Sequence, residues 1–254
     1  MGVRHAAKRA LYPLAPTALQ RVIDRAYYKR RLIAGTLVSE PELAILDRMV
    51  RAGSVVADVG ANLGSYTLQL SRIVGPDGKV LALEPIPRTA ALLDHFVKRL
   101  APHRNVEVIN AAAGESEGRA EMFLPREGGL PNFYVASLLS IHEGPTSTTA
   151  VQVTTLDVQR KKLDRPISFI KIDAEGAELM VLRGAREVIL KDRPVLLCEI
   201  GESARAGLYG AADVEDWLVA HRYRLHQLVG GEILACSTRE PLSSSRNYFA
   251  FPEA

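Results

Sequence analysis

The sequence predicts an α/β fold in which helices cover both faces of a mostly parallel, doubly wound β-sheet. Short apolar runs rich in β-branched residues recur along the chain, and amphipathic segments with helical spacing lie between them. The first run, 55–59, ends in a glycine-rich turn that leads directly into a helical segment at Ser65, which is the start of a βαβ unit. Closing strands at 223–229, 232–236 and 247–251 follow one another without a helix between them, so an antiparallel closing strand is expected.

A helical extension, residues 1–52, is expected before the sheet domain, which spans 53–254. The spacing predicts a helix over 17–35. A capping box with proline in its first turn, 39–42, starts a second helix that ends at Gly53. A chain of 254 residues can bury one sizeable core, so the sheet is expected to form a single domain.

Strand and helix patterns alternate through the rest of the chain. Further buried strands are expected at 79–85, 105–110 and 194–200 and from Ile167, and helices at 88–100, 177–190 and 211–222. An edge strand at 118–124 and its partner at 150–156 enclose residues 125–149, which are rich in Gly, Pro, Ser and Thr. A loop of this length in a compact domain is usually a lid, a binding loop or disordered.

Asp58 decides which ligand the glycine-rich turn is expected to bind. Gly60 and Gly64 bracket the turn between strand and helix, an arrangement that places a ligand at a helix N-terminus. A carboxylate two residues before the first glycine would repel a pyrophosphate but attract an ammonium or sulfonium group. Asn62 also occupies the position where the dinucleotide fingerprint has its second glycine. The turn is therefore predicted to bind S-adenosylmethionine rather than NAD.

Glu84 ends the second strand, 20 residues after Gly64. From this position a carboxylate can accept hydrogen bonds from ribose hydroxyls. The alternative is a charge at a helix N-terminus, since Pro85 begins the next helical segment. The acid follows a fully apolar strand, which favours the ribose. Ala111 and Ala112 follow the third strand and would let an adenine ring lie against the backbone, although a run of alanines is equally good packing.

A second group of polar residues surrounds the end of the strand from Ile167. Lys171 lies on an otherwise apolar strand, and Asp173 follows at the edge where open α/β sheets place their chemistry. Asp173 is predicted to act as a general base or to bind a divalent ion with Glu199, which ends the next strand. His142, within 125–149, is the alternative base near neutral pH.

Composition and charge narrow the class of protein. With 47% hydrophobic and 24% charged residues, the chain is typical of a soluble globular protein. Residues 1–31 carry eight Lys or Arg against Asp24 alone, so they hold a local charge of +7 and the rest of the chain holds −4. A solvated helix over the core is the favoured interpretation of this arm. The alternatives are contact with a membrane surface, nucleic acid or an acidic partner.

A cytoplasmic location is expected. Cys198 and Cys236 lie far apart and form neither a disulfide framework nor a zinc motif. No apolar stretch approaches the roughly 18 residues of a membrane span, and the N-terminus lacks the apolar segment of a secretory signal. Nucleic acid is not expected as a partner, because aromatic and basic residues do not alternate. The apolar N-terminal helices could pair two chains as a homodimer.

Four motifs in order carry a family resemblance: 58–67 (Asp-Val-Gly-Ala-Asn-Leu-Gly-Ser-Tyr-Thr), 83–85 (Leu-Glu-Pro), 155–157 (Thr-Leu-Asp) and 169–178 (Phe-Ile-Lys-Ile-Asp-Ala-Glu-Gly-Ala-Glu). Together they resemble the FkbM family of S-adenosylmethionine-dependent methyltransferases. The resemblance implies a Rossmann-like class I methyltransferase fold and O-methylation of a sugar or polyketide hydroxyl. No shared motif covers the probable acceptor-binding loop, residues 125–149.

The resemblance implies that the methionine-side loop contains Asp58 and that Glu84 binds the ribose, while Asp173 borders the methyl group. The predicted reaction is a direct displacement at the sulfonium methyl, in which Asp173 or His142 takes the acceptor proton, with Lys171 as a further catalytic residue, or Mg²⁺ polarises the hydroxyl. The predicted cofactor-binding residues are Asp58, Gly60, Asn62, Gly64, Tyr66, Thr67, Glu84, Pro85, Ala111 and Ala112. The alternatives are a nucleotide-dependent oxidoreductase on the same fold and a non-catalytic cofactor-binding module.

Overall fold

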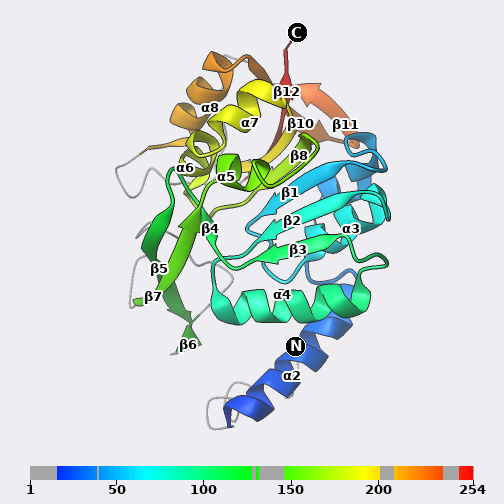
Figure 1. Ribbon diagram of the computed structural model, residues 1–254, viewed down its shortest axis with the longest axis vertical. Helices are drawn as coiled ribbons and strands as arrows, with labels where there is room; N and C mark the ends of the chain where they lie inside the picture. Colours follow the sequence, from blue (N-terminus) through cyan, green and yellow to red (C-terminus); the bar gives the residue numbers. More distant parts are fainter. Residues whose placement is uncertain are drawn as a thin grey trace.

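A mostly parallel β-sheet forms the centre of the computed structural model, which describes residues 16–38, 40–127, 130–131, 146–200, 209–236 and 246–253 (Figure 1). In the described part of the chain the sheet has eight strands in the order β11-β10-β12-β9-β8-β1-β2-β3. Neighbours from β9 to β3 pair in parallel, whereas β12 is antiparallel to both β9 and β10. The predicted parallel sheet with an antiparallel closing strand is confirmed. The strands are β1 (Val55–Val59), β2 (Lys79–Leu83), β3 (Val106–Ile109), β8 (Ile167–Ile172), β9 (Val195–Ile200), β10 (Tyr223–Val229), β11 (Glu232–Ala235) and β12 (Arg246–Pro252).

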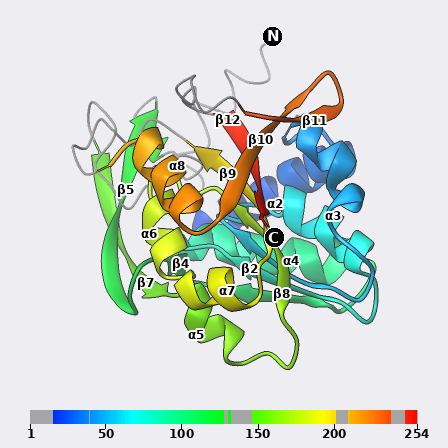
Figure 2. The ribbon, with the colours of Figure 1, turned by 90° about the horizontal axis from the view of Figure 1, so that it is seen from above.

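Helices cover both faces of this sheet (Figures 1 and 2). Strand β1 is buried on both faces because its alternate side chains enter two different apolar clusters. Val55, Ala57 and Val59 pack with α6, α7 and α8, whereas Val56 packs with α3. Asp58 shares the α3 side with Val56, since side chains alternate along a strand. The helices are α3 (Ser65–Val74), α4 (Pro87–Leu100), α5 (Leu156–Arg160), α6 (Glu178–Arg183), α7 (Arg186–Lys191) and α8 (Ala211–Ala220).

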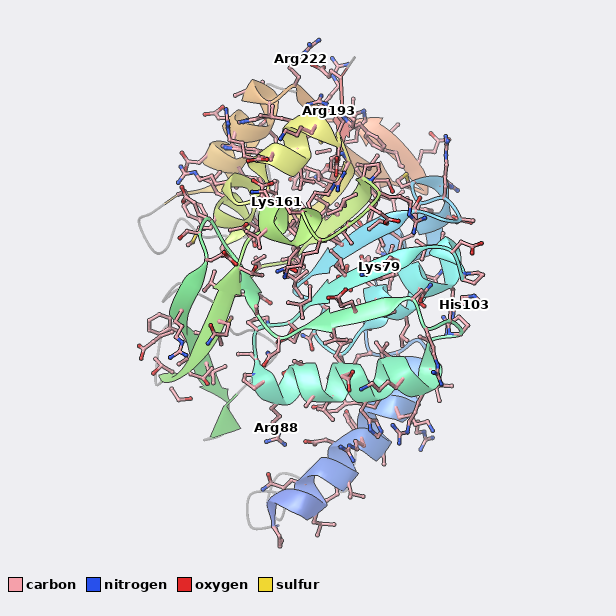
Figure 3. The ribbon with its side chains drawn as sticks, in the orientation of Figure 1. Lys79, Arg88, His103, Lys161, Arg193 and Arg222 are labelled. Atoms are coloured by element: carbon pink, nitrogen blue, oxygen red, sulfur yellow. The ribbon has the colours of Figure 1, made fainter. Side chains whose placement is uncertain are left out.

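The N-terminal part contains α2 (Thr17–Ile33) and the 3₁₀ helix η2 (Pro41–Arg48). Arg88 at the start of α4 forms an ion pair with the buried Asp24 of α2 at 2.5 Å, and this pair joins the two helices (Figure 3). The predicted capping box at 39–42 is wrong. Glu40 is the N-cap residue of η2 and makes no side-chain cap bond, because its carboxylate accepts hydrogen bonds from elsewhere in the fold. Ser39 lies outside the described residues.

A second, smaller sheet lies beside the main one, in the order β4-β7-β5-β6. The predicted pairing of the strands around 118–124 and 150–156 is confirmed by β5 and β7, which are antiparallel to each other. Both strands extend into the predicted loop, which therefore begins later and ends earlier than 125–149. Residues 132–145, including His142, lie outside the described residues. The strands are β4 (Ala112–Ala113), β5 (Gly118–Glu127), β6 (Leu130–Pro131) and β7 (Thr146–Thr154).

The helix predicted over 177–190 is divided into α6 and α7 at Gly184. A Cβ atom at Gly184 would lie 1.8 Å from the carbonyl oxygen of Gly114, so only glycine allows the two backbones to approach this closely. Asp157 stabilises the break. Its backbone N–H donates to the Gly184 carbonyl at 3.0 Å, and its carboxylate accepts from the N–H groups of Glu187 (3.0 Å) and Val188 (2.9 Å). The Thr-Leu-Asp motif thus has a structural function.

Replacing Asp157 with alanine is expected to lower the free energy of unfolding by about 1–2 kcal/mol, because two N–H groups of the first turn of α7 lose their acceptor. Chemical denaturation of the purified variant measures this change. Asp164→Ala is the control, since that carboxylate is exposed and its nearest contact with Arg165 is 3.7 Å. Equal stability of the two variants would contradict the capping role of Asp157.

No helix within the described ranges is long and apolar enough to cross a membrane.

Candidate active site

The turn between β1 and α3 depends on two glycines in left-handed backbone conformations. Gly60 has φ +73°, and a Cβ atom there would lie 1.8 Å from the backbone oxygen of Asp173. Gly64 has φ +93°, and a Cβ atom there would lie 2.7 Å from Leu93. Side chains other than hydrogen would push the β1 and β8 edges apart or displace α4. The fold therefore brings the ends of β1 and β8 together at backbone distance.

Asp58 is fully buried near the end of β1, and the described residues provide a hydrogen bond to only one of its two oxygens. The Thr67 hydroxyl donates to Oδ2 at 2.5 Å, whereas Oδ1 is buried without a hydrogen-bond partner among the described residues. Burial raises the pKa of the Asp58 carboxyl, while the neighbouring charge of Lys171 and the Thr67 hydroxyl act in the opposite direction. A buried carboxylate oxygen without a partner is costly, so a cationic or hydrogen-bonding ligand would stabilise it.

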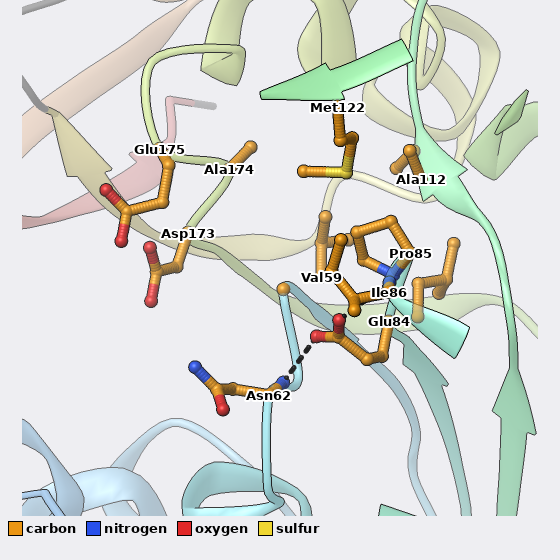
Figure 4. A pocket seen from close by; sticks show the side chains of 13 residues that line it. Val59, Asn62, Glu84, Pro85, Ile86, Ala112, Met122, Asp173, Ala174 and Glu175 are labelled. Atoms are coloured by element: carbon orange, nitrogen blue, oxygen red, sulfur yellow. Dashed lines mark hydrogen bonds between the residues drawn. The ribbon is translucent and has the colours of Figure 1, made fainter. Parts of the chain in front are cut away.

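Glu84 is held immediately after β2 by two backbone N–H groups. Asn62 donates to Oε2 and Ile86 donates to Oε1, each at 2.9 Å (Figure 4). Asn62 adopts φ +49°, which allows its N–H to reach the carboxylate. Burial raises the pKa of Glu84 to about 7, although these two backbone bonds act against the increase. The Asn110 side chain fixes the segment further, by donating to the carbonyls of Glu84 and Pro85 at 2.9 Å each.

Two cavities meet at Gly60, Asn62 and Asp173, which line both of them. The first is bounded by Glu84 and by largely apolar side chains, as Figure 4 shows for Ile86 and Met122. The second is charged, and its lining includes Glu40, Asp58, Tyr66 and Lys171. One side therefore suits an apolar ring with a hydroxylated sugar, and the other suits charged groups.

A buried lysine, Lys171, forms an ion pair with the partly exposed Asp173, which lines both cavities. The Lys171 Nζ atom lies 2.6 Å from Asp173 Oδ2 and 4.9 Å from the centre of the Tyr66 ring. Lys171 is 2% exposed. Burial lowers the pKa of Lys171, but the charges of Asp173 and Asp58 outweigh this effect and raise it overall. Lys171 is therefore a cation at neutral pH, and it is not a base.

The loop after β8 is shaped by Glu178. Its Oε1 atom accepts from the N–H groups of Ala174 (3.2 Å) and Gly176 (2.9 Å), which lie on either side of Glu175. Glu175 itself has φ +48°. Burial and neighbouring acids raise the pKa of Glu175 to about 8, and those of Glu178 and Glu199 to about 7. Several carboxyl groups that titrate near neutral pH thus surround Asp173.

The predicted magnesium site gains no support from this geometry. Throughout the described ranges, no group of three or more His, Cys, Asp or Glu side chains is placed to hold a metal ion. One oxygen of Asp173 is already engaged by Lys171. The predicted ligands Asp173 and Glu199 lie near the same edge of the sheet, since the charge of Asp173 raises the pKa of Glu199.

Most of the predicted cofactor residues gather around these cavities. Asp58, Gly60, Asn62 and Tyr66 line the charged cavity, while Glu84, Pro85 and Ala112 line the other. Gly64 and Thr67 do not line either cavity, but the Thr67 hydroxyl donates to Asp58. Ala113 lines the first cavity in place of the predicted Ala111. Sequence reasoning missed Glu40, Ile86, Asn110 and Met122. Of these four residues, only Ile86 had a signal in the sequence, because it follows Glu84-Pro85 directly.

The geometry is that of a protein that binds a cofactor with a cationic end, a ribose and an apolar ring. The residues fit S-adenosylmethionine, because the Asp58 oxygen that has no partner among the described residues suits a cation and Glu84 in the neighbouring cavity suits a ribose. The family model for the methyltransferase FkbM domain matches residues 58–225. The chain belongs to the FkbM family of S-adenosylmethionine-dependent methyltransferases. The alternative of a nucleotide-dependent oxidoreductase is not supported.

Known proteins agree with this assignment at the level of fold and class. A crystal structure of an FkbM methyltransferase from Methylobacillus flagellatus aligns with a TM-score of 0.53 at 19% identity, over 97% of this chain and 59% of that one. A probable cobalt-precorrin-6B C(15)-methyltransferase from Thermoplasma volcanium is 29% identical over 143 residues, which cover 52% of this chain and 71% of the relative. Methyltransferase 1 of Beauveria bassiana is 28% identical over 149 residues, or 52% of this chain and 58% of the relative. The chain thus spans less than two thirds of the FkbM structure and of the fungal relative.

Proposed function

We propose that the protein transfers a methyl group from S-adenosylmethionine to a hydroxyl oxygen of a small molecule. The observation that carries this proposal is the buried, unpartnered Oδ1 of Asp58 in a charged cavity that joins the Glu84 cavity. Asp58 would bind the cationic methionine end, and Glu84 would accept from the ribose hydroxyls. Ile86, Ala112 and Met122 would contact the adenine ring. The bound cofactor would supply an activated methyl group.

Asp173 is proposed as the general base. It lines both cavities and so lies where a methyl group between the two ends of the cofactor would face the acceptor. The Asp173 carboxylate would take the proton of the acceptor hydroxyl as that oxygen receives the methyl group that the cofactor would supply. Lys171, bonded to Asp173 at 2.6 Å, orients the carboxylate. His142 remains a predicted alternative base outside the described residues.

A sugar or polyketide hydroxyl is the proposed acceptor. The family resemblance favours this class, and carboxyl groups such as Asp173 and Glu175 are suitable acceptors for the hydroxyls of a polyol. Residues 125–149 are proposed to contact the acceptor, because strands β5 and β7 lead toward them from the sheet that contributes Met122. The free thiols of Cys198 and Cys236 support the expected cytoplasmic setting.

The affinity for S-adenosylmethionine is expected to rise with pH. In the free protein the Glu84 carboxyl, with a pKa of about 7, is largely protonated at pH 6 and ionised at pH 8. Ribose hydroxyls favour the ionised form, so binding lowers this pKa and releases a proton below about pH 7. Affinity should therefore be about tenfold weaker at pH 6 than at pH 8.

Calorimetric titrations at both pH values, in buffers of different ionisation enthalpy, measure the affinity and the protons released. Glu175 and Glu199 titrate in the same range and act in the same direction, since their ionised forms also favour a cation. Glu84→Gln is therefore expected to reduce the pH dependence without abolishing it. An affinity that increases toward acidic pH in the wild type would contradict this role of the carboxyl.

The proposed reaction is tested by incubating the protein with S-adenosylmethionine and a panel of sugars and polyketides. Methylated product is detected by mass spectrometry and S-adenosylhomocysteine by chromatography. Asp173→Asn should bind the cofactor but form product at least about 100-fold more slowly, within the range typical of a lost general base. Cofactor binding with no turnover of any acceptor would favour the non-catalytic module.

A further inference from the structure

Glu40 lies outside the residues that the family model matches, yet it lines the cavity that contains Asp58. It is contributed by the segment between α2 and η2. Two distant parts of the chain fix its side chain, because the Tyr66 hydroxyl of α3 donates to Oε2 at 2.5 Å and the Asn247 amide of β12 donates to the same atom at 3.0 Å. A flexible surface glutamate would not be held by two such bonds.

The hydrogen bonds of Glu40 leave its second oxygen available. Both donors reach Oε2, and the described residues provide no donor to Oε1. Its position as N-cap of η2 does not explain the side chain, since it makes no cap bond. Asp58 Oδ1, buried in the same cavity, likewise has no partner among the described residues. Two carboxylates from different segments therefore line one cavity, and each has an oxygen to which no described residue donates.

The charge balance of this cavity calls for a cation. Among its described lining residues, Lys171 is the positive group, and its Nζ atom already bonds to Asp173 at 2.6 Å. Asp58 and Glu40 then remain as two negative charges. An ammonium group has three N–H donors and one positive charge, so it can bond to both carboxylates at once.

We propose that Glu40 and Asp58 together bind the α-ammonium group in the methionine part of the cofactor. This assignment rests on the proposed function. Leu37 and Val38 line the same cavity, so these two residues and Glu40 border the methionine end of the site. The N-terminal part of the chain thereby becomes a component of the cofactor site, and Tyr66 and Asn247 are the residues that position Glu40.

The test compares three ligands that differ at this end. S-adenosylmethionine and S-adenosylhomocysteine carry the α-ammonium group, whereas 5′-methylthioadenosine lacks the whole amino-acid portion. In the full chain, Glu40→Gln keeps an acceptor for Tyr66 and Asn247 but removes the charge. Calorimetry should show about tenfold or more weaker binding of the first two ligands and unchanged binding of 5′-methylthioadenosine.

Two further variants complete the test. Asp47→Asn removes an exposed carboxylate of the same helix η2 and should change no affinity. Tyr66→Phe removes one bond that positions Glu40, so it should weaken S-adenosylmethionine about threefold and leave 5′-methylthioadenosine unchanged; it provides the same comparison if Glu40→Gln fails to fold.

Unchanged S-adenosylmethionine binding in Glu40→Gln, or an equal loss of affinity for all three ligands, would overturn the role of Glu40 but leave the proposed function standing. Failure of the wild type to bind any of the three would overturn the proposed function and this assignment with it.

Discussion

Replacing Asp58 with asparagine is expected to weaken S-adenosylmethionine binding about 100-fold, which corresponds to about 2.7 kcal/mol. The variant keeps the size of the side chain and a partner for the Thr67 hydroxyl, but it removes the charge whose Oδ1 has no other partner. A hydrogen bond between charged groups is worth about 1.5–3 kcal/mol, so one lost contact accounts for the effect. Titration calorimetry measures the affinity, and thermal unfolding confirms that the variant is folded.

Asp94→Asn is the matched control for Asp58. Asp94 is an exposed carboxylate on α4, paired with Lys98 at 2.7 Å, and surface pairs of this kind contribute less than about 1 kcal/mol. The affinity of the Asp94→Asn variant for the cofactor should equal that of the wild type. A folded Asp58→Asn protein that binds the cofactor normally would contradict the assignment of the charged cavity to the methionine end.

Gly60→Ala is expected to be the most destabilising substitution at the site. The added Cβ atom would lie 1.8 Å from the Asp173 carbonyl oxygen, in a backbone conformation, φ +73°, that L-residues rarely adopt. Steric overlap and backbone strain together should lower the free energy of unfolding by about 3 kcal/mol or more. For a chain of this size the melting temperature should fall by about 6–12 °C. Cofactor binding should be lost because the backbones of the turn after β1 and the end of β8, which border both cavities, are pushed apart.

Gly75→Ala separates the two causes of this effect. Gly75 has a similar φ of +68°, but nothing lies within 4 Å of the position of an added Cβ atom. The variant should lose only the free energy of adopting this backbone conformation, φ +68° and ψ −171°, about 1–3 kcal/mol, and should bind the cofactor normally. Differential scanning calorimetry of both variants measures the difference. Equal melting temperatures would show that the close contact of Gly60 with Asp173 is not important for stability.

The sheet and its cofactor edge were predictable because their signals are local. The apolar run 55–59, the glycines around Asn62 and the acid after an apolar strand, Glu84, each report a requirement of the backbone within a few residues. The mostly parallel sheet and the antiparallel closing strand followed from the same patterns.

The features that sequence reasoning missed depend on contacts between distant segments. Glu40 resembles a helix cap in the sequence, and only the positions of Tyr66 and Asn247 bring it to the cofactor cavity. Met122 enters the other cavity because β5 pairs with β7, which in turn pairs with β4 in the second sheet. The sequence predicted the pair of strands, but no local pattern indicated that the pair would lie beside the cofactor cavity. The break at Gly184 likewise arises from its approach to Gly114.

Titration of the wild-type protein with S-adenosylmethionine tests the central claim most directly. We expect one cofactor per chain with a micromolar dissociation constant, and competition by S-adenosylhomocysteine at the same site. A folded wild-type protein that does not bind S-adenosylmethionine would contradict the assignment of the Asp58 and Glu84 cavities as a cofactor site.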